Sequence, residues 1–99
     1  RMPLKEKDDP TSFDYEKIGA LFDDFLARGF DYFDTAYTYH GYRAEEAVRK
    51  ALVERHPRES YYLATKLPVW MMEGPQDKDR TGYGKHLRRT AEKLRCEIF

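Results

Sequence analysis

Cysteine is almost absent from this chain. Cys96 is the only one among 99 residues, so no internal disulfide can form, and we expect a reducing compartment, the cytoplasm. No apolar run approaches the ~18 residues of a membrane span, and no secretory signal opens the chain. One cysteine and three scattered histidines do not form a metal-site pattern, so we expect no metal.

An excess of charge of one sign is also lacking, because 18 Lys and Arg balance 18 Asp and Glu. We therefore expect neither nucleic acid nor a membrane as a partner, and the basic run 85–89 is most simply the solvated face of a helix. What is present is enough apolar and aromatic material, 40% and 15%, to predict a packed core in one small domain.

The first half of the sequence predicts a loop followed by one amphipathic helix. Residues 5–14 are polar and rich in turn formers, and Asp14 is a candidate N-cap, because its carboxylate can accept from free amides of the first turn. Gly29 stands where a left-handed C-terminal cap is expected. Between them the apolar positions recur three and four residues apart, as in a helix: Ile18, Leu21, Phe22, Phe25 and Leu26.

The rest of the chain predicts alternating strands and helices. We expect a strand over 30–36, a loop over 37–43, a helix over 44–54 and a second strand over 61–65. After a loop over 69–84, Leu87, Ala91 and Leu94 suggest a third helix, and Ile98 and Phe99 the start of another strand. Two strands about 30 residues apart with one helix between them form a right-handed crossover with parallel strands. The predicted fold class is therefore parallel α/β.

Functional side chains of such folds gather where strands end. Asp34, Tyr37 and Tyr39 stand at or just after the end of the first predicted strand, and Lys66 follows the second. A nearby ammonium favours the phenolate form of a tyrosine and so eases donation of the phenolic proton, while a carboxylate fixes the ammonium in place. Such a trio suits protonation of a carbonyl oxygen during hydride transfer. The hydride must come from a cofactor, since no side chain supplies one.

Three segments in this order resemble the aldo-keto reductase family. Residues 29–39 read GFDYFDTAYTY and are similar to its Asp-x-Ala-x-x-Tyr motif. Residues 45–52, EEAVRKAL, are similar to the helix that follows, and 64–67, ATKL, to its lysine motif. The resemblance implies a (β/α)₈ barrel that reduces aldehydes or ketones with NADPH or NADH. In it Tyr39 would be the general acid, Lys66 the neighbouring ammonium, and Asp34 the partner of Lys66 and part of the cofactor site.

The resemblance also implies that the barrel is only partly present. A complete barrel needs about 250 residues, so residues 1–99 would be the N-terminal portion of one barrel domain, with residues expected before Arg1. The family's catalytic histidine, at the end of the next strand, would lie beyond Phe99. Segments 2–4, 39–41 and 66–68 are similar to a microbial branch whose members often carry a C-terminal iron–sulphur segment, although this chain has no cysteine cluster.

Each candidate residue also has a purely structural interpretation. Asp34 could cap a turn, Tyr39 could be a packing residue, and Lys66 could be a solvated charge. Tyr37 and Trp70 could line a substrate pocket or pack. For the whole chain, the alternatives to a reductase are a non-catalytic barrel subunit or interaction module that keeps the scaffold, and a small independent α/β module.

Overall fold

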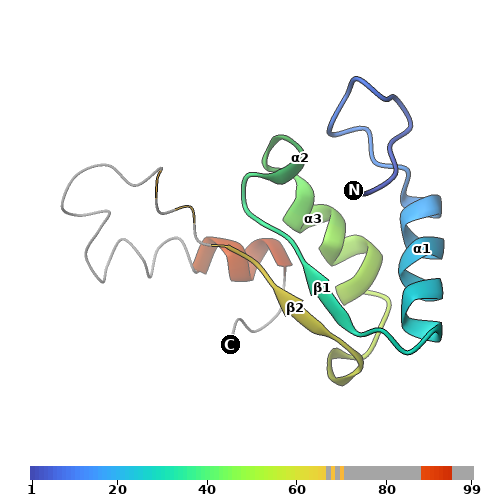
Figure 1. Cartoon of the computed structure of the whole chain (residues 1–99). Helices are drawn as coiled ribbons and strands as arrows, with labels where there is room; N and C mark the ends of the chain where they lie inside the picture. The colour runs from blue at the N-terminus through green and yellow to red at the C-terminus, as the bar shows by residue number, and fades with distance from the viewer. Residues whose placement is uncertain (67, 69, 71–87, 95–99) are drawn as a thin grey trace.

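The computed structural model describes residues 1–66, Pro68, Trp70 and 88–94. Its elements follow in the order α1, β1, α2, α3, η1, η2 and β2 (Figure 1). The chain opens with a loop that closes on itself through an antiparallel bridge between Leu4 and Phe13. Among these residues, no helix is long and apolar enough to cross a membrane.

Helix α1 spans Tyr15–Ala27 and has both caps that the sequence predicts. The Asp14 carboxylate accepts from the Lys17 amide at 3.2 Å. At the other end Gly29 has a φ of +90°, and its amide donates to the Leu26 carbonyl while the Phe30 amide donates to the Phe25 carbonyl. The Phe25 and Phe30 rings stack at 5.2 Å. Paired bonds of this kind with an apolar contact form a Schellman ending, which turns the chain back toward the sheet.

Strands β1 (Tyr32–Asp34) and β2 (Tyr62–Ala64) pair in parallel, as predicted, with Phe33 opposite Leu63. Both are shorter than the predicted spans 30–36 and 61–65. The prediction that the first strand begins at Phe30 was wrong, because Phe30 belongs to the Schellman ending of α1, where its side chain is 57% exposed. Figure 1 shows the two strands side by side, with the helices behind one face of the sheet.

The crossover between the strands is helical over the predicted range but changes form along its length. The one-turn segment α2 (Tyr39–Tyr42) leads into α3 (Ala44–Val48) and then into a π-helical turn, η1 (Arg49–Val53). In η1 the Glu54 amide donates to the carbonyl five residues back, that of Arg49. The sequence predicted neither α2, which lies in the expected loop 37–43, nor the wider π turn. A short 3₁₀ turn, η2 (Arg58–Ser60), precedes β2.

The core lies between one face of the sheet and the helices. Phe33 is the buried residue of β1, and its ring meets those of Phe22 and Phe25 of α1, each at 5.0 Å. The other face of the sheet is open, with Tyr32 61% and Tyr62 66% exposed. The other members of the buried cluster come from α1, α3, η1, the helix at 88–94 and two flanking loop positions: Phe13, Ile18, Ala47, Val48, Ala51, Leu52, Tyr61 and Leu94.

Residues 88–94 are helical, as the spacing of Ala91 and Leu94 predicts, and Leu94 is 1% exposed. The predicted loop over 69–84, apart from Trp70, and the predicted strand start at Ile98 lie outside the described residues. The parallel α/β arrangement is thus confirmed for the two strands and their crossover, which are too small a part to show a barrel.

Candidate active site

The carboxyl ends of β1 and β2 bring Asp34 and Lys66 together. The Lys66 ammonium donates to Asp34 Oδ1 at 2.8 Å and to the Thr35 carbonyl at 3.1 Å. Because the strands are parallel and Asp34 pairs with Ala64, their ends meet at one edge of the sheet. Both side chains are about half exposed, at 54% and 46%, so the pair contributes little to stability and mainly sets geometry.

Tyr39 lies against the same ammonium. Lys66 Nζ is 5.0 Å from the centroid of the Tyr39 ring, within the range of a cation–π contact. The hydrogen bond to Asp34 raises the pKa of Lys66 above its ordinary value of 10.5, partial desolvation opposes the increase, and the Tyr39 oxygen adds to it. The amine is therefore a fixed positive charge between a carboxylate and a phenol. The structure brings together all three residues for which the sequence predicts a catalytic role.

A hollow of about 270 Å³ opens beside this trio. Half of its lining residues are apolar, and its polar groups come from the end of β1 and from Arg1, Tyr39 and His40. A second hollow of about 360 Å³ adjoins it at Tyr39 and continues toward Pro10. The first is lined by Arg1, Met2, Leu21, Phe22, Phe33, Asp34, Thr35, Tyr39, His40 and Val48.

The turn that follows Tyr39 is left-handed over three residues. The φ angles are +52° at His40, +62° at Gly41 and +68° at Tyr42. Left-handed backbone is ordinary for glycine but costs about 1–2 kcal/mol at other residues, so surrounding contacts must hold the turn. This strain directly adjoins the proposed proton donor, and strained backbone is frequent at functional sites.

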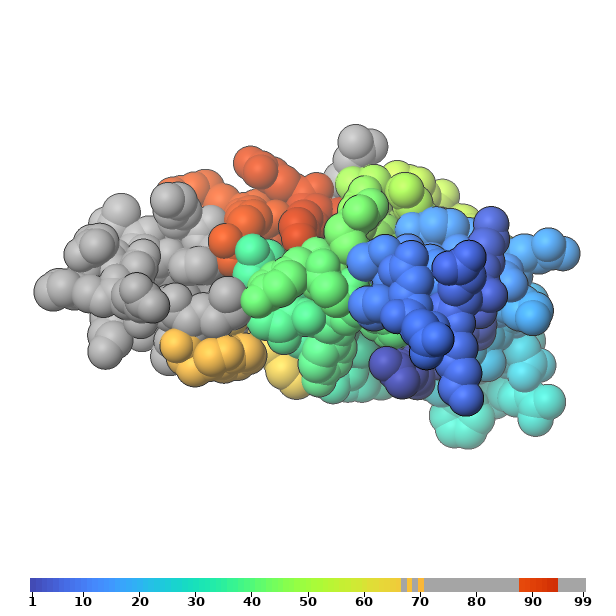
Figure 2. Space-filling model, turned by 90° about the horizontal axis from the view of Figure 1, so that it is seen from above, coloured from blue at the N-terminus to red at the C-terminus, as the bar shows by residue number. Residues whose placement is uncertain are grey.

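The N-terminal loop holds one side of that turn. His40 Nδ1 is 3.0 Å from the Pro10 carbonyl, and because a carbonyl only accepts, this nitrogen carries the proton of the bond. The imidazole also meets the Phe13 ring at 5.2 Å. Figure 2 shows the N-terminal segment, in blue, seated against the segment of α2 and α3, in green. These contacts give His40 a structural role in the turn.

The helix at 88–94 holds the other side. Lys93 Nζ donates to the Tyr42 carbonyl at 2.9 Å. The Tyr37 ring meets that of Tyr42 at 5.3 Å and is covered by the Arg89 guanidinium, 3.8 Å from its centroid. Arg89, expected on the solvated face of its helix, therefore packs on an aromatic ring. In the described part of the chain, the Tyr37 ring therefore packs between Tyr42 and Arg89.

Trp70, the other predicted pocket residue, is 71% exposed, and the residues that follow it, Met71 and Met72, lie outside the described residues. Its pocket role stays a prediction. Within the ranges 1–66, 68, 70 and 88–94, no group of three or more His, Cys, Asp or Glu side chains could hold a metal ion.

Sequence reasoning missed Glu45. The residue stands in the first turn of α3, where an acidic side chain suits the helix dipole, yet it is 0% exposed. Its Oε1 accepts from the Thr65 hydroxyl at 2.7 Å, and its Oε2 has no hydrogen-bond partner in the described part of the structure. The available signal was Thr65 itself, a hydroxyl residue just past the end of β2, the strand that follows the crossover.

Comparison with known proteins identifies the family of the chain. A sequence model described as the Aldo/keto reductase family matches residues 2–98, almost the entire chain. Searches of curated proteins and of solved structures returned no match. The matched range contains the two strands, their crossover and the three residues gathered at the carboxyl edge of the sheet. The chain therefore belongs to the aldo/keto reductase family, a family of oxidoreductases.

Proposed function

We propose that this chain carries the proton-donating part of a site that reduces aldehydes or ketones with NADPH or NADH, with Tyr39 as the proton donor. The observation that supports this most directly is the position of Lys66 Nζ, 2.8 Å from Asp34 Oδ1 and 5.0 Å from the centroid of the Tyr39 ring. Family membership supports an oxidoreductase in general.

The role of each residue follows from its charge. When a carbonyl is reduced, negative charge develops on its oxygen, and a phenol beside an ammonium can donate a proton to it, because the ammonium favours the phenolate that remains. Lys66 stays charged through its bond to Asp34, which raises its pKa. The Asp34 carboxylate and the Thr35 carbonyl both accept from this amine and so fix its position.

The residues present fit the ring end of a nicotinamide cofactor. Asp34, Thr35 and Tyr39 lie together in the lining of the first hollow, whose other members are Arg1, His40 and five apolar side chains. When bound, the cofactor supplies the hydride that no side chain can. In this proposal Asp34 touches both Lys66 and the cofactor, and Tyr37 and Trp70 belong to the wider substrate pocket.

We further propose that the two strands are part of a (β/α)₈ barrel in the cytoplasm, with residues 1–99 its N-terminal portion. The open face of the sheet supports the barrel. It carries Tyr32 and Tyr62, 61% and 66% exposed, on the side opposite the helices, and in a barrel that side becomes the packed interior. The substrate is a small carbonyl compound, and neither nucleic acid nor a membrane takes part.

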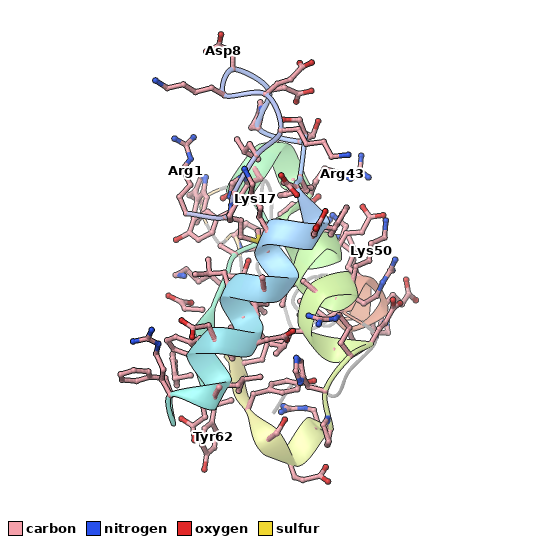
Figure 3. The ribbon with its side chains drawn as sticks, turned by 90° about the vertical axis from the view of Figure 1, so that its right-hand side faces the viewer. Arg1, Asp8, Lys17, Arg43, Lys50 and Tyr62 are labelled. Atoms are coloured by element: carbon pink, nitrogen blue, oxygen red, sulfur yellow. The ribbon has the colours of Figure 1, made fainter. Side chains whose placement is uncertain are left out.

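Binding and turnover, measured on the complete barrel that contains these residues, test the proposal together. The quenching of protein fluorescence by NADPH measures cofactor binding, and NADPH oxidation with an aromatic aldehyde measures turnover. Tyr39→Phe should lower the turnover rate by about 10²–10⁴-fold, the usual contribution of a general acid, and leave NADPH affinity unchanged. Tyr62→Phe is the matched control, because it also removes a tyrosine hydroxyl, but far from the hollow. Tyr62 lies at the opposite end of the view from Arg1, one of the residues that line the hollow (Figure 3).

Two results would contradict the proposal. Near-normal turnover in Tyr39→Phe would remove the proton-donor role. If a complete barrel that contains these residues neither binds NADPH nor oxidises it, a scaffold without catalysis is the better interpretation.

A further inference from the structure

Glu45 is a buried carboxylate that belongs neither to the catalytic trio nor to the protein surface. Glu45 is 0% exposed, one of the largest fully buried side chains in the described part of the protein. Only Oε1 has a hydrogen-bond partner there, the Thr65 hydroxyl. A buried carboxylate with one unpaired oxygen is costly, so an apolar residue would serve packing better at this position.

The partner of Glu45 shows what the carboxylate can control. Strand β2 ends at Ala64, whose carbonyl accepts from the Thr35 amide at 2.8 Å. Thr65 and Lys66 come after this last bond between the strands, where a chain is free to fray. The Glu45–Thr65 bond, at 2.7 Å, is the next contact along the chain. It ties the residue before Lys66 to a helix buried in the core.

We propose that Glu45 is a positioning residue, whose buried carboxylate fixes Thr65 and thereby the direction from which Lys66 reaches Asp34 and Tyr39. It touches neither the reacting groups nor the hollow described above. The inference rests on the proposed function, but it concerns the position of Lys66, which can be measured without any turnover.

The helix that carries Glu45 is a rigid base for such a contact. Its neighbours Ala44 and Ala47 are both 0% exposed, so this face of α3 is pressed into the core. Glu46, one position along, instead bonds the Arg43 guanidinium at 2.7 Å with its side chain 28% exposed. Two successive glutamates thus occupy different environments, and the second provides a control for the first.

Titration of the Lys66 side chain by NMR tests the proposal without any need for activity. In the wild-type chain the pKa of Lys66 should lie above 10.5, because of the bond to Asp34. Glu45→Ala should bring it down toward 10.5, since Lys66 then leaves Asp34 for part of the time. Glu45→Gln keeps an acceptor for Thr65 and should restore most of the wild-type value, and Glu46→Gln should leave the value unchanged.

Removing the other partner keeps the test decisive if Glu45→Ala does not fold. Thr65→Val deletes the hydroxyl and should lower the Lys66 pKa as Glu45→Ala does, whereas Thr65→Ser should not. The double variant Glu45→Ala/Thr65→Val should shift it no further than either single change, because both remove one bond.

The results separate this inference from the proposed function. A wild-type Lys66 titration in folded Glu45→Ala or Thr65→Val, or additive shifts in the double variant, would overturn the positioning role. If the raised pKa of Lys66 is lost in Glu45→Ala and Thr65→Val, while the complete barrel does not oxidise NADPH, the positioning role is supported and the proposed function is contradicted.

Discussion

Replacement of Phe33 by alanine should be among the most destabilising changes on the sheet. The side chain is 9% exposed, and its ring meets those of Phe22 and Phe25 at 5.0 Å and that of Tyr61 at 6.3 Å. Truncating a buried phenylalanine costs about 3–5 kcal/mol. A domain of this size is stable by about 5–15 kcal/mol, so Phe33→Ala should remove a large share of the free energy of unfolding.

A leucine at the same position divides that cost into its parts. Leucine keeps most of the apolar volume but loses three aromatic contacts, each worth about 0.5–1.5 kcal/mol beyond the area buried. We therefore expect Phe33→Leu to lose at least about 1.5 kcal/mol, the sum of the three lower values, but less than the alanine variant. For residues 1–99 alone, Tyr32→Ala is the control, because its side chain, on the neighbouring position of β1, is 61% exposed there and should change stability by about 0.5 kcal/mol at most.

Urea unfolding followed by far-UV circular dichroism measures these differences. For an m value of about 2 kcal/mol/M, Phe33→Ala should move the midpoint down by about 1.5–2.5 M without a change in m. The reasoning fails if Phe33→Ala loses less than about 1 kcal/mol, or if Tyr32→Ala costs as much, because the helix-facing side of the sheet would then not be the core.

Three further changes probe other contacts. A hydrogen bond from Arg55 chiefly lowers the pKa of Asp23 below 3.8, so its contribution to stability is present above that pH and is lost as pH falls through the lowered value. Asp23→Asn should therefore flatten the decline in thermal midpoint from about pH 5 to pH 2, and an unchanged decline would argue against the bond. Gly41→Ala places a Cβ at a φ of +62°, 3.3 Å from a threonine methyl, and should cost about 1–2 kcal/mol in urea unfolding; a neutral effect would contradict the left-handed turn. Asp34→Asn should lower the NMR-measured pKa of Lys66 toward 10.5, and a wild-type value would mean that the pair does not form in solution.

The parts of the fold that the sequence predicted well depend on local signals. Asp14 and Gly29 mark the two ends of α1, because a cap is a contact between near neighbours in the chain. The meeting of Asp34 and Lys66 followed from topology alone, since parallel strands separated by one helix end at the same edge.

The remaining features depend on contacts that no local pattern encodes. A glutamate in a first helical turn has the same sequence signal whether it faces water, as Glu46 partly does, or is buried like Glu45. The positive φ of His40 results from its bond to Pro10, thirty residues away along the chain, and from the Phe13 ring. The Arg89 guanidinium likewise packs on the ring of Tyr37, a residue fifty-two positions earlier in the chain.

The left-handed turn restricts which amino acids can follow Tyr39. At His40 and Tyr42 the backbone favours glycine, asparagine and aspartate over the β-branched residues, whatever the side chain contributes. In a saturation library scored for folding, survivors at these two positions should be enriched in those three types and poor in valine and isoleucine. His40→Asn would suit the left-handed backbone but delete the imidazole, and so it separates the backbone preference at this position from the contacts with Pro10 and Phe13.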